Sequence, residues 1–324
     1  MTSVLRQLQA EWNSLVPAAQ ERGIRRVRLL NLPLETIAYR RAKLEWLRAQ
    51  LGTSDAFDSL SFGVELEVIM PRGQNVHTVA REIQAAGLDC RPEGLNHSTR
   101  TWWKTVPDGS LRSANGVEVV SPVLRGEAGF AQIRKVCAVL SRLGARVNKH
   151  CGFHVHIGLG SEPVDFFKRL IKLYSSAEPA IDAFMAESRR GSNCGYARSL
   201  RPMVRHDRLD AARTVAEVTR AVGQNPEPAY TRGPGRYHKI NMQNFAVKGT
   251  VEFRQHQGTF EAVKVENWVK LIMRMCMAAR VEDKLAATLD ELMAAVKATD
   301  AEKQYFAERT AQFQTQTQSP RRPR

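Results

Sequence analysis

Segments in the middle of the chain alternate apolar and polar residues with a period of two, as does a β-strand that buries one face. Ser61–Met70 places Glu65 and Glu67 on one face, and Gly116–Pro122 places Glu118 on its polar face. The intervening residues are mainly aliphatic and need a core. The carboxylates must therefore point together toward the other side of a sheet. This alternation predicts a sheet with one polar face.

Three further segments add histidine, arginine and amide side chains to the same pattern. They are Gly152–Leu159 with His154 and His156, Gly249–His256 with Glu252, Arg254 and His256, and Tyr237–Phe245 with Lys239, Asn241 and Gln243. A face with this many charges needs water or cations to compensate them. Mg²⁺ commonly lies between carboxylates and substrate phosphates. We therefore expect a divalent cation on this face, with Arg254 toward a phosphate, because a planar guanidinium suits that group.

Helical periodicity and turn signals surround these strands. Helices are expected over residues 1–50, 75–86, 126–143, 163–187 with a break near Pro179, 207–222, 261–279 and most of 281–311, and further strands over 101–106 and 145–149. Short connections such as Pro107–Ser110 favour antiparallel neighbours, so the expected fold class is α+β with a largely antiparallel sheet and helices packed on its apolar face. The expected parts are an N-terminal helical segment (1–60), a central domain (61–280), a C-terminal helix (281–312) and a basic mobile tail (313–324).

Composition bounds the class of protein. The 324 residues are 43% hydrophobic, which excludes a disordered chain, and the sequence contains neither a transmembrane span nor a secretory leader, so we expect a cytoplasmic protein. The net charge of +15 is typical of proteins that bind nucleic acid or anionic substrates, and the basic tail is compatible with an origin in a phage or mobile element. Five scattered cysteines without a CxxC pair indicate reduced thiols.

Simpler interpretations exist for each motif taken alone. A strand with glutamates on one face is often a solvated surface, and so is a run of arginines such as the one between Arg189 and Arg213. Cys151 with His154 and His156 could hold zinc, although this spacing is unusual for a structural site. Cys151 beside His154 could also imitate a nucleophile and its base, although both lie in an apolar strand. The sequence contains no P-loop, no dinucleotide-binding fingerprint and no serine-hydrolase elbow.

Taken together, five stretches resemble the amidoligase family, a branch of the carboxylate–amine ligases. The stretches are FGVELEV, VPDGSL with GVEVVSPVL, GARVNKHCGFHVHIG, KINMQNF and TVEFRQHQGT, and they extend from about Ser61 to Arg280. The resemblance implies a curved sheet with a catalytic polar face, like that of glutamine synthetase and glutamate–cysteine ligase. It also implies an ATP- and Mg²⁺- or Mn²⁺-dependent enzyme that activates a carboxylate as an acyl phosphate, which an amine then attacks to form an amide.

The resemblance also assigns expected roles to individual residues. Metal ligands are expected at Glu65, Glu67, Glu118, His154 and Glu252, and contacts with nucleotide or phosphate at His156, Arg254, Lys239 and Asn241. Catalytic roles are expected at Arg254, Glu65, Glu67 and Glu252. The arginines of a lid are expected among Arg189, Arg190 and Arg198. The expected partners are small-molecule or peptide carboxylate and amine substrates. Nucleic acid is not required, although the charge would permit it, and no membrane is involved. A homo-oligomer is compatible with the multimers that glutamine-synthetase-like enzymes form.

Two other functions are compatible with the same residues. A metal-dependent nuclease or phosphoesterase would also use histidines, carboxylates and a basic surface, and it should cut nucleic acid without ATP. A non-catalytic nucleic-acid-binding module on a ligase-like fold should bind DNA with a steep salt dependence and release no ADP. The intact set of Glu, His and Arg residues counts against the binding module, because a protein that only binds would have no need for carboxylates that face a phosphate.

Overall fold

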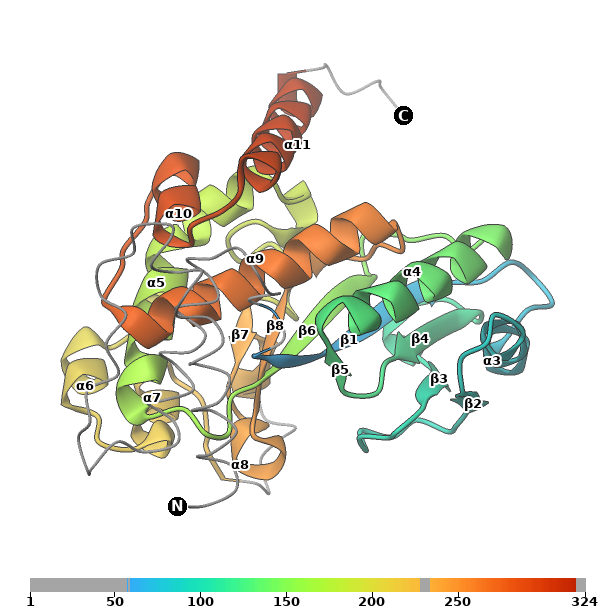
Figure 1. Ribbon diagram of the computed structural model, residues 1–324, viewed down its shortest axis with the longest axis horizontal. Helices are drawn as coiled ribbons and strands as arrows, with labels where there is room; N and C mark the ends of the chain where they lie inside the picture. The colour runs from blue at the N-terminus through green and yellow to red at the C-terminus, as the bar shows by residue number, and fades with distance from the viewer. Residues whose placement is uncertain (1–56, 58, 228–233, 319–324) are drawn as a thin grey trace, which may run out of the picture. The chain divides into compact units, whose positions relative to one another are not determined.

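The computed structural model describes residues 57, 59–227 and 234–318 (Figure 1). Its contacts divide the chain into one unit of residues 1–61 with 125–127 and another of residues 62–124 with 128–324, and the fold below is that of the second unit. The helices expected over residues 1–50 lie outside the described residues. So do residues 228–233 of the connector and the last six residues of the basic tail.

Eight strands of the described chain form one sheet. The strands are β1 (Ser61–Ile69), β2 (Cys90–Pro92), β3 (Trp103–Pro107), β4 (Gly116–Val120), β5 (Leu124–Arg125), β6 (Gly152–Gly158), β7 (Ile240–Asn241) and β8 (Thr250–Gln257). Their order is β2-β3-β4-β1-β6-β8-β7, and β5 pairs with β1. The β2–β3 pair is parallel, whereas the β3–β4, β4–β1, β1–β6, β6–β8 and β8–β7 pairs are antiparallel. This confirms the expected mostly antiparallel sheet; its curvature stays a prediction.

Helices make up most of the remaining structure. They are α3 (Val76–Ala85), α4 (Gly126–Arg142), α5 (Val164–Ala183), α6 (His206–Ala211), α7 (Val215–Ala221), α8 (Phe245–Lys248), α9 (Ala262–Val281), α10 (Leu289–Ala295) and α11 (Asp300–Gln318), with short 3₁₀ turns η1 (Gly109–Leu111), η2 (Glu187–Arg189), η3 (Arg201–Met203) and η5 (Pro234–Tyr237). Sheet and helices together confirm the mixed α and β class.

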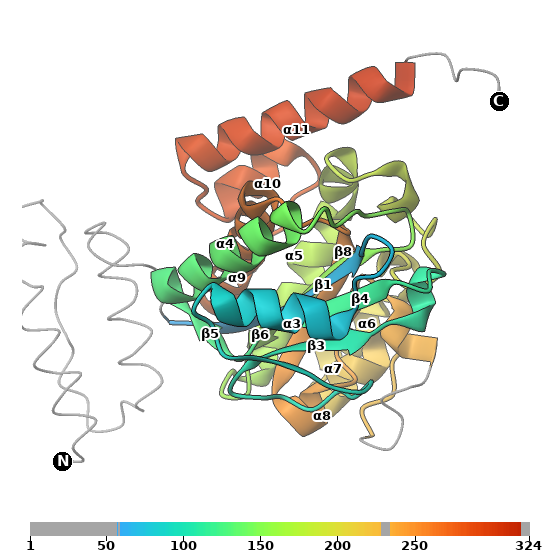
Figure 2. The same ribbon diagram turned by 90° about the vertical axis from the view of Figure 1, so that its right-hand side faces the viewer.

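Helices α3, α4, α5 and α9 pack against the sheet through side chains on its apolar face (Figures 1 and 2). Phe62 of β1 stacks on Phe130 of α4 with 5.2 Å between the ring centroids. Phe253 of β8 lies 5.8 Å from Tyr174 of α5, measured in the same way. These rings and the aliphatic residues around them are buried. Burial of this face stabilises the sheet by about 25 cal/mol for each Å² of apolar surface removed from water.

Several expected elements differ in extent from those observed. The strand expected over Tyr237–Phe245 is only β7, because η5 precedes it and α8 begins at Phe245. The expected strand at 145–149 forms a single bridge, between Arg146 and Ile69. The helix expected over 207–222 is two helices, α6 and α7. The Thr214 side chain accepts a hydrogen bond from Glu217 N and so caps the start of α7.

The helical regions toward the C-terminus also differ from expectation. Pro179 does not break α5, which continues from Val164 to Ala183. Buried residues on both sides of Pro179, such as Ala177 and Ile181, hold this segment in place despite the lost hydrogen bond. The single helix expected over 281–312 is α10 and α11, and α11 reaches Gln318, within the segment expected to be a mobile tail.

A β-bulge changes the alternation of β8. Phe153 of β6 pairs with His256, and Val155 pairs with Phe253, so β8 spans this interval with one residue more than β6. Beyond the bulge, His256 lies on the apolar side, where its ring contacts Phe153 and Trp268 of α9 with 5.5 Å between centroids in each case. The expectation that His256 shares a face with Glu252 and Arg254 is therefore wrong, because an extra residue separates the two parts of the strand.

The buried position of His256 predicts how stability depends on pH. Burial lowers the pKa of His256 to about 3, although its Nδ1 lies 2.7 Å from the Gln257 carbonyl oxygen, and the positive charges of Arg309, Arg189 and Lys264 lower it further. Below pH about 6.5 the unfolded chain binds a proton at this histidine that the folded chain excludes. Stability from this group is therefore fully present above that pH and is lost as the pH falls toward 3.

We expect the wild type to lose roughly 2 kcal/mol more unfolding free energy than His256→Gln between pH 7.5 and pH 5. Glutamine keeps a donor for the Gln257 carbonyl but does not titrate, so the carboxylates contribute equally to both proteins. Urea unfolding followed by circular dichroism at the two pH values gives the difference. Equal losses in the two proteins would contradict the assignment of a neutral, buried His256.

Candidate active site

The strand register brings the polar residues of four strands into neighbouring pairs. The pairs are Glu67 with Glu118, Glu65 with His154, and His156 with Glu252. These residues belong to β1, β4, β6 and β8, which are adjacent in the sheet. Of the residues expected at the site, the structure therefore gathers Glu65, Glu67, Glu118, His154, His156 and Glu252 on the face away from the apolar core.

Glu65 lies at the centre of this group. Its Oε2 is 3.0 Å from His154 Nδ1, and its Oε1 is 3.1 Å from His156 Nε2. Burial raises the pKa of Glu65, but the charge of His156 and hydrogen bonds from both imidazoles outweigh burial and hold the pKa well below its usual range. Glu65 is therefore an ionised carboxylate that contacts both histidines, one through each oxygen.

Glu252 has a second set of partners. Arg254 Nη1 donates a hydrogen bond to its Oε1, and Asn241 Nδ2 donates to its Oε2 at 2.7 Å. Burial raises the pKa of Glu252, but the positive charges of Arg254 and His156 outweigh this and lower it to about 2. The Arg254 side chain is also fixed, because its Nε donates to the Tyr196 carbonyl oxygen at 3.1 Å. Arg254 therefore holds its charge beside an ionised Glu252.

Glu67 and Glu118 add negative charge on the other side of Glu65. The Gly152 N–H donates a hydrogen bond of 2.5 Å to Glu67 Oε2. Burial raises the pKa of Glu118 well above its usual range, and the charges of Glu65, Glu67 and Asp108 raise it further. Such crowding of carboxylates destabilises their ionised forms unless a cation or proton lies among them.

The donor atoms fit divalent cations. The ligand atoms form two groups, and within each group they lie within 4.8 Å of one another. Glu65, His156 and Glu252 supply the first group, and Glu65, Glu118 and His154 supply the second. Both groups contain Glu65, whose two oxygens could serve different ions. A set rich in carboxylate oxygens favours Mg²⁺ or Mn²⁺. Glu67 is close to this set, with its Oε1 3.7 Å from His154 Nε2.

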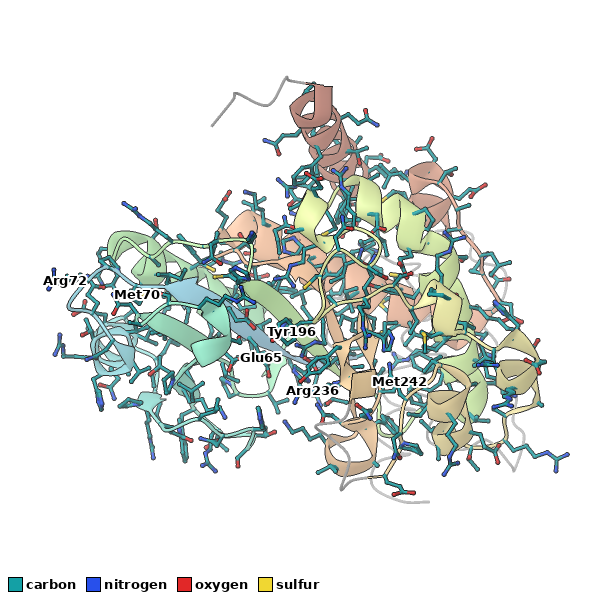
Figure 3. All side chains as sticks on the ribbon, turned by 180° about the vertical axis from the view of Figure 1, so that it is seen from behind. Glu65, Met70, Arg72, Tyr196, Arg236 and Met242 are labelled. Carbon is teal, nitrogen blue, oxygen red and sulfur yellow. The ribbon has the colours of Figure 1, made fainter. Side chains whose placement is uncertain are left out.

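The carboxylates and histidines line a cavity of about 750 Å³. Basic side chains also line it: Arg189, Arg236, Lys248 and, on β8 itself, Arg254. In Figure 3, Glu65, Tyr196 and Arg236 lie together, whereas Met70 and Arg72, which follow the last residue of β1, lie away from them. The cavity therefore combines a carboxylate- and histidine-lined face with cations that could contact an anionic ligand.

A comparison with known protein families shows where this chain belongs. A sequence model described as "Putative amidoligase enzyme" matches residues 58–276. The chain belongs to the amidoligase family. This range contains every strand of the sheet, from β1 to β8, and most of α9.

A search of curated proteins gave no match. A crystal structure titled as that of a novel glutamine synthase homolog matches 81% of this chain and 68% of its own at 12% identity, with a TM-score of 0.37, which is too low to support an argument about fold or function. None of the helices in the described ranges combines the length and apolar character needed to cross a membrane.

In this amidoligase, two expected phosphate contacts lie elsewhere. Lys239 is completely buried, and its Nζ donates hydrogen bonds to Glu178 Oε1 at 2.9 Å and Asp182 Oδ1 at 2.6 Å, both on α5. Lys239 therefore points away from the cavity. Asn241 is also buried and does not line the cavity, although it donates to Glu252 and so orients a carboxylate of the site.

The three arginines expected to form a lid have different positions. Arg189 lines the cavity and is 2% exposed, and its Nη2 donates to the Cys151 carbonyl oxygen at 2.6 Å. Arg190 donates to the Met185 carbonyl oxygen at 2.9 Å, and Arg198 pairs through its backbone with Tyr237 and Lys239. Neither Arg190 nor Arg198 lines the cavity. The structure therefore brings only Arg189 to the site.

Cys151 does not have the environment of a nucleophile. Its side chain is buried, and burial raises the pKa of its thiol. The candidate metal groups in the described part of the chain contain no cysteine. These observations argue against both the zinc site and the cysteine–histidine pair considered from the sequence.

Sequence reasoning missed Lys104, Tyr196, Arg236 and Lys248. Alternation could have found Lys104, because it lies between Trp103 and Thr105 and must point to the polar side of β3. The other three lie in a loop, in η5 and at the end of α8, where no periodic pattern indicates direction. Only the fold brings them to the cavity.

Proposed function

We propose that this chain is an ATP- and Mg²⁺-dependent carboxylate–amine ligase that forms an amide through an acyl phosphate. Family membership supports the ligase class in general. The observation that carries the finer proposal is the pair of candidate metal groups that share Glu65, in a cavity that Arg254 also lines. Ligands for two divalent cations beside an arginine suit the phosphates of a nucleotide.

The proposed reaction has two steps. A substrate carboxylate oxygen attacks the γ-phosphorus of ATP, and the bond from that phosphorus to the ADP oxygen breaks. The amine nitrogen then attacks the acyl carbon, phosphate leaves with the electrons of the carbon–oxygen bond, and the amine loses a proton to solvent or a nearby base. Bound Mg²⁺ would supply charge neutralisation and orientation of the phosphates.

The residues of the chain would perform separate tasks in this scheme. Glu65, Glu118, His154, His156 and Glu252 would hold the metal ions. Arg254 would stabilise charge that develops on the transferred phosphoryl group, because its guanidinium is fixed by Glu252 and the Tyr196 carbonyl before any ligand binds. Asn241 would keep Glu252 oriented through its hydrogen bond of 2.7 Å.

The test is ADP and phosphate release from Mg-ATP by the purified protein. The reactions contain pools of amino acids, polyamines and acidic peptides, each assayed alone and with each other. We expect release that requires both a carboxylate pool and an amine pool, and mass spectrometry should detect a product that is lighter than the two substrates by one water. Release without product, or cleavage of DNA or RNA without ATP, would overturn the proposal.

A further inference from the structure

The loop between β2 and β3 forms one wall of the cavity. Four of its side chains line the cavity: Leu95, His97, Ser98 and Thr99. None of these is a carboxylate, a lysine or an arginine, in contrast to the Glu and His residues on the strands. The loop therefore presents a largely uncharged surface to a ligand that the strands and basic residues would bind through charge.

This loop is held in one conformation by Glu93. The Glu93 carboxylate accepts hydrogen bonds from Arg100 Nε at 3.0 Å, from Trp102 Nε1 at 3.0 Å and from Asn96 Nδ2 at 2.8 Å. The Arg100 hydrogen bond, which outweighs burial, lowers the pKa of Glu93 to about 2. The first and last parts of the loop are therefore joined through one ionised side chain.

Lys104 of β3 holds the middle of the loop. Its side chain is buried, and its Nζ donates to Asn96 O at 3.0 Å, Asn96 Oδ1 at 2.9 Å and Ser98 O at 2.9 Å. An ammonium group has three N–H donors, so the loop satisfies all of them. Within the described residues, no carboxylate forms an ion pair with Lys104. The charge of Lys104 is thus used to fix the backbone that carries Leu95, His97 and Ser98.

An exposed leucine lies on this fixed loop. Leu95 is 65% exposed, and two other large apolar side chains that line the cavity are Tyr196, at 53%, and Val247, at 58%. The described residues include eight exposed large apolar side chains, and three of them line this one cavity. Exposed apolar side chains gathered at a cavity are typical of a surface that a ligand covers.

Basic side chains indicate the charge of that ligand. Arg236 and Lys248 line the same cavity, and neither forms an ion pair within the part of the chain that the structure describes. The Arg236 guanidinium lies over the Tyr237 ring, 5.8 Å from its centroid. A ligand that satisfies both the cations and the apolar side chains would carry a negative charge next to an apolar group.

We propose that the β2–β3 loop, residues 93–102, selects a carboxylate substrate that carries an apolar side chain. Leu95 would contact that side chain, and Lys104 would act as a positioning residue that holds the loop. The proposal rests on the proposed ligase function for its reaction, but it concerns binding and is tested without turnover.

The probes are N-acetyl-leucyl-glutamate and N-acetyl-alanyl-glutamate, which have the same charge and differ in one apolar side chain. Isothermal titration with Mg²⁺ and a non-hydrolysable ATP analogue gives their dissociation constants. The leucyl side chain removes more apolar surface from water than the alanyl side chain does, so we expect wild type to bind the leucyl peptide at least about tenfold more tightly. A ratio near one would overturn the proposal.

Two serine variants test whether Leu95 causes the preference for the leucyl peptide. Leu95→Ser should reduce the ratio to within about threefold. The matched control is Leu285→Ser, because Leu285 is 69% exposed but does not line the cavity, and it should keep the wild-type ratio. An unchanged ratio in Leu95→Ser would overturn the proposal, as would a loss of affinity for the ATP analogue, because Leu95 would then contact the nucleotide.

Lys104 variants test the positioning role. Lys104→Met should reduce the preference for the leucyl peptide while the affinity for the ATP analogue is unchanged, and Lys104→Arg should restore part of it. A preference that survives Lys104→Met would show that the loop keeps its position without this residue. If wild type shows the preference but no pool supports ADP release, the ligase proposal fails and the binding inference stands.

Discussion

The Glu65→Gln variant should lose ADP release by a factor of about 10³ while it remains folded. Glu65 belongs to both candidate metal groups, so the loss of its charge weakens both at once. Glutamine keeps the shape of the side chain, but its amide nitrogen cannot accept a hydrogen bond from an imidazole as the lost oxygen could. His154 and His156, which each contact one Glu65 oxygen, would then have one acceptor between them.

The measurement compares ADP release with binding of Mg²⁺ or Mn²⁺ by calorimetry, and circular dichroism monitors the fold. The control is Glu82→Gln, because Glu82 pairs with Arg142 at 2.9 Å at the surface and does not line the cavity. The control should keep its activity.

Arg254→Ala should also abolish release, because it removes the partner of Glu252 as well as a cation from the cavity. Activity retained in both Glu65→Gln and Arg254→Ala would refute the assignment of the site.

The largest expected effect on stability comes from Lys239→Met. The Lys239 ammonium is buried between Glu178, which is 2% exposed, and Asp182, and removal of the cation leaves a buried carboxylate without its ion pair. Breaking a buried pair from one side costs about 3–5 kcal/mol. We expect a loss of this size in the free energy of urea unfolding. The double variant Lys239→Met/Glu178→Gln should recover part of it, because the uncompensated charge is gone.

Lys172→Met is the matched control for this variant. Lys172 also extends from α5, and its Nζ lies 2.7 Å from Asp210, but this pair is at the surface. Exposed ion pairs contribute about 1 kcal/mol or less, so the control should unfold almost as the wild type does. Equal losses in Lys239→Met and Lys172→Met would show that the buried pair has no special role in stability.

The sequence allowed prediction of the strands that carry the site because their signal is local. Alternation in β1, β4, β6 and β8 gives the direction of each carboxylate and histidine without knowledge of the partner strand. The structure places these residues side by side, as the shared polar face required. The His256 side chain was misplaced because its direction depends on a bulge, and a bulge is a property of two paired strands.

The remaining features depend on contacts between distant residues. Lys239 alternates with apolar residues as Asn241 does, but its direction is set by two acidic residues on α5. The β2–β3 loop has no periodicity, and its conformation depends on hydrogen bonds from Glu93 and Lys104. Arg236 and Lys248 reach the cavity from short helical turns. No pattern within any of these segments shows which residues they contact.

The register of the sheet also affects how the protein is made. Glu65, Glu67 and Glu118 leave the ribosome well before Glu252, Arg254 and Asn241, yet β8 pairs with β6 beside them. Until β8 emerges, Glu65 and Glu67 lack the positive charge of Arg254, with which they interact in the complete sheet. The nascent sheet therefore has an unfinished edge at β6, which is a potential pairing partner for other chains.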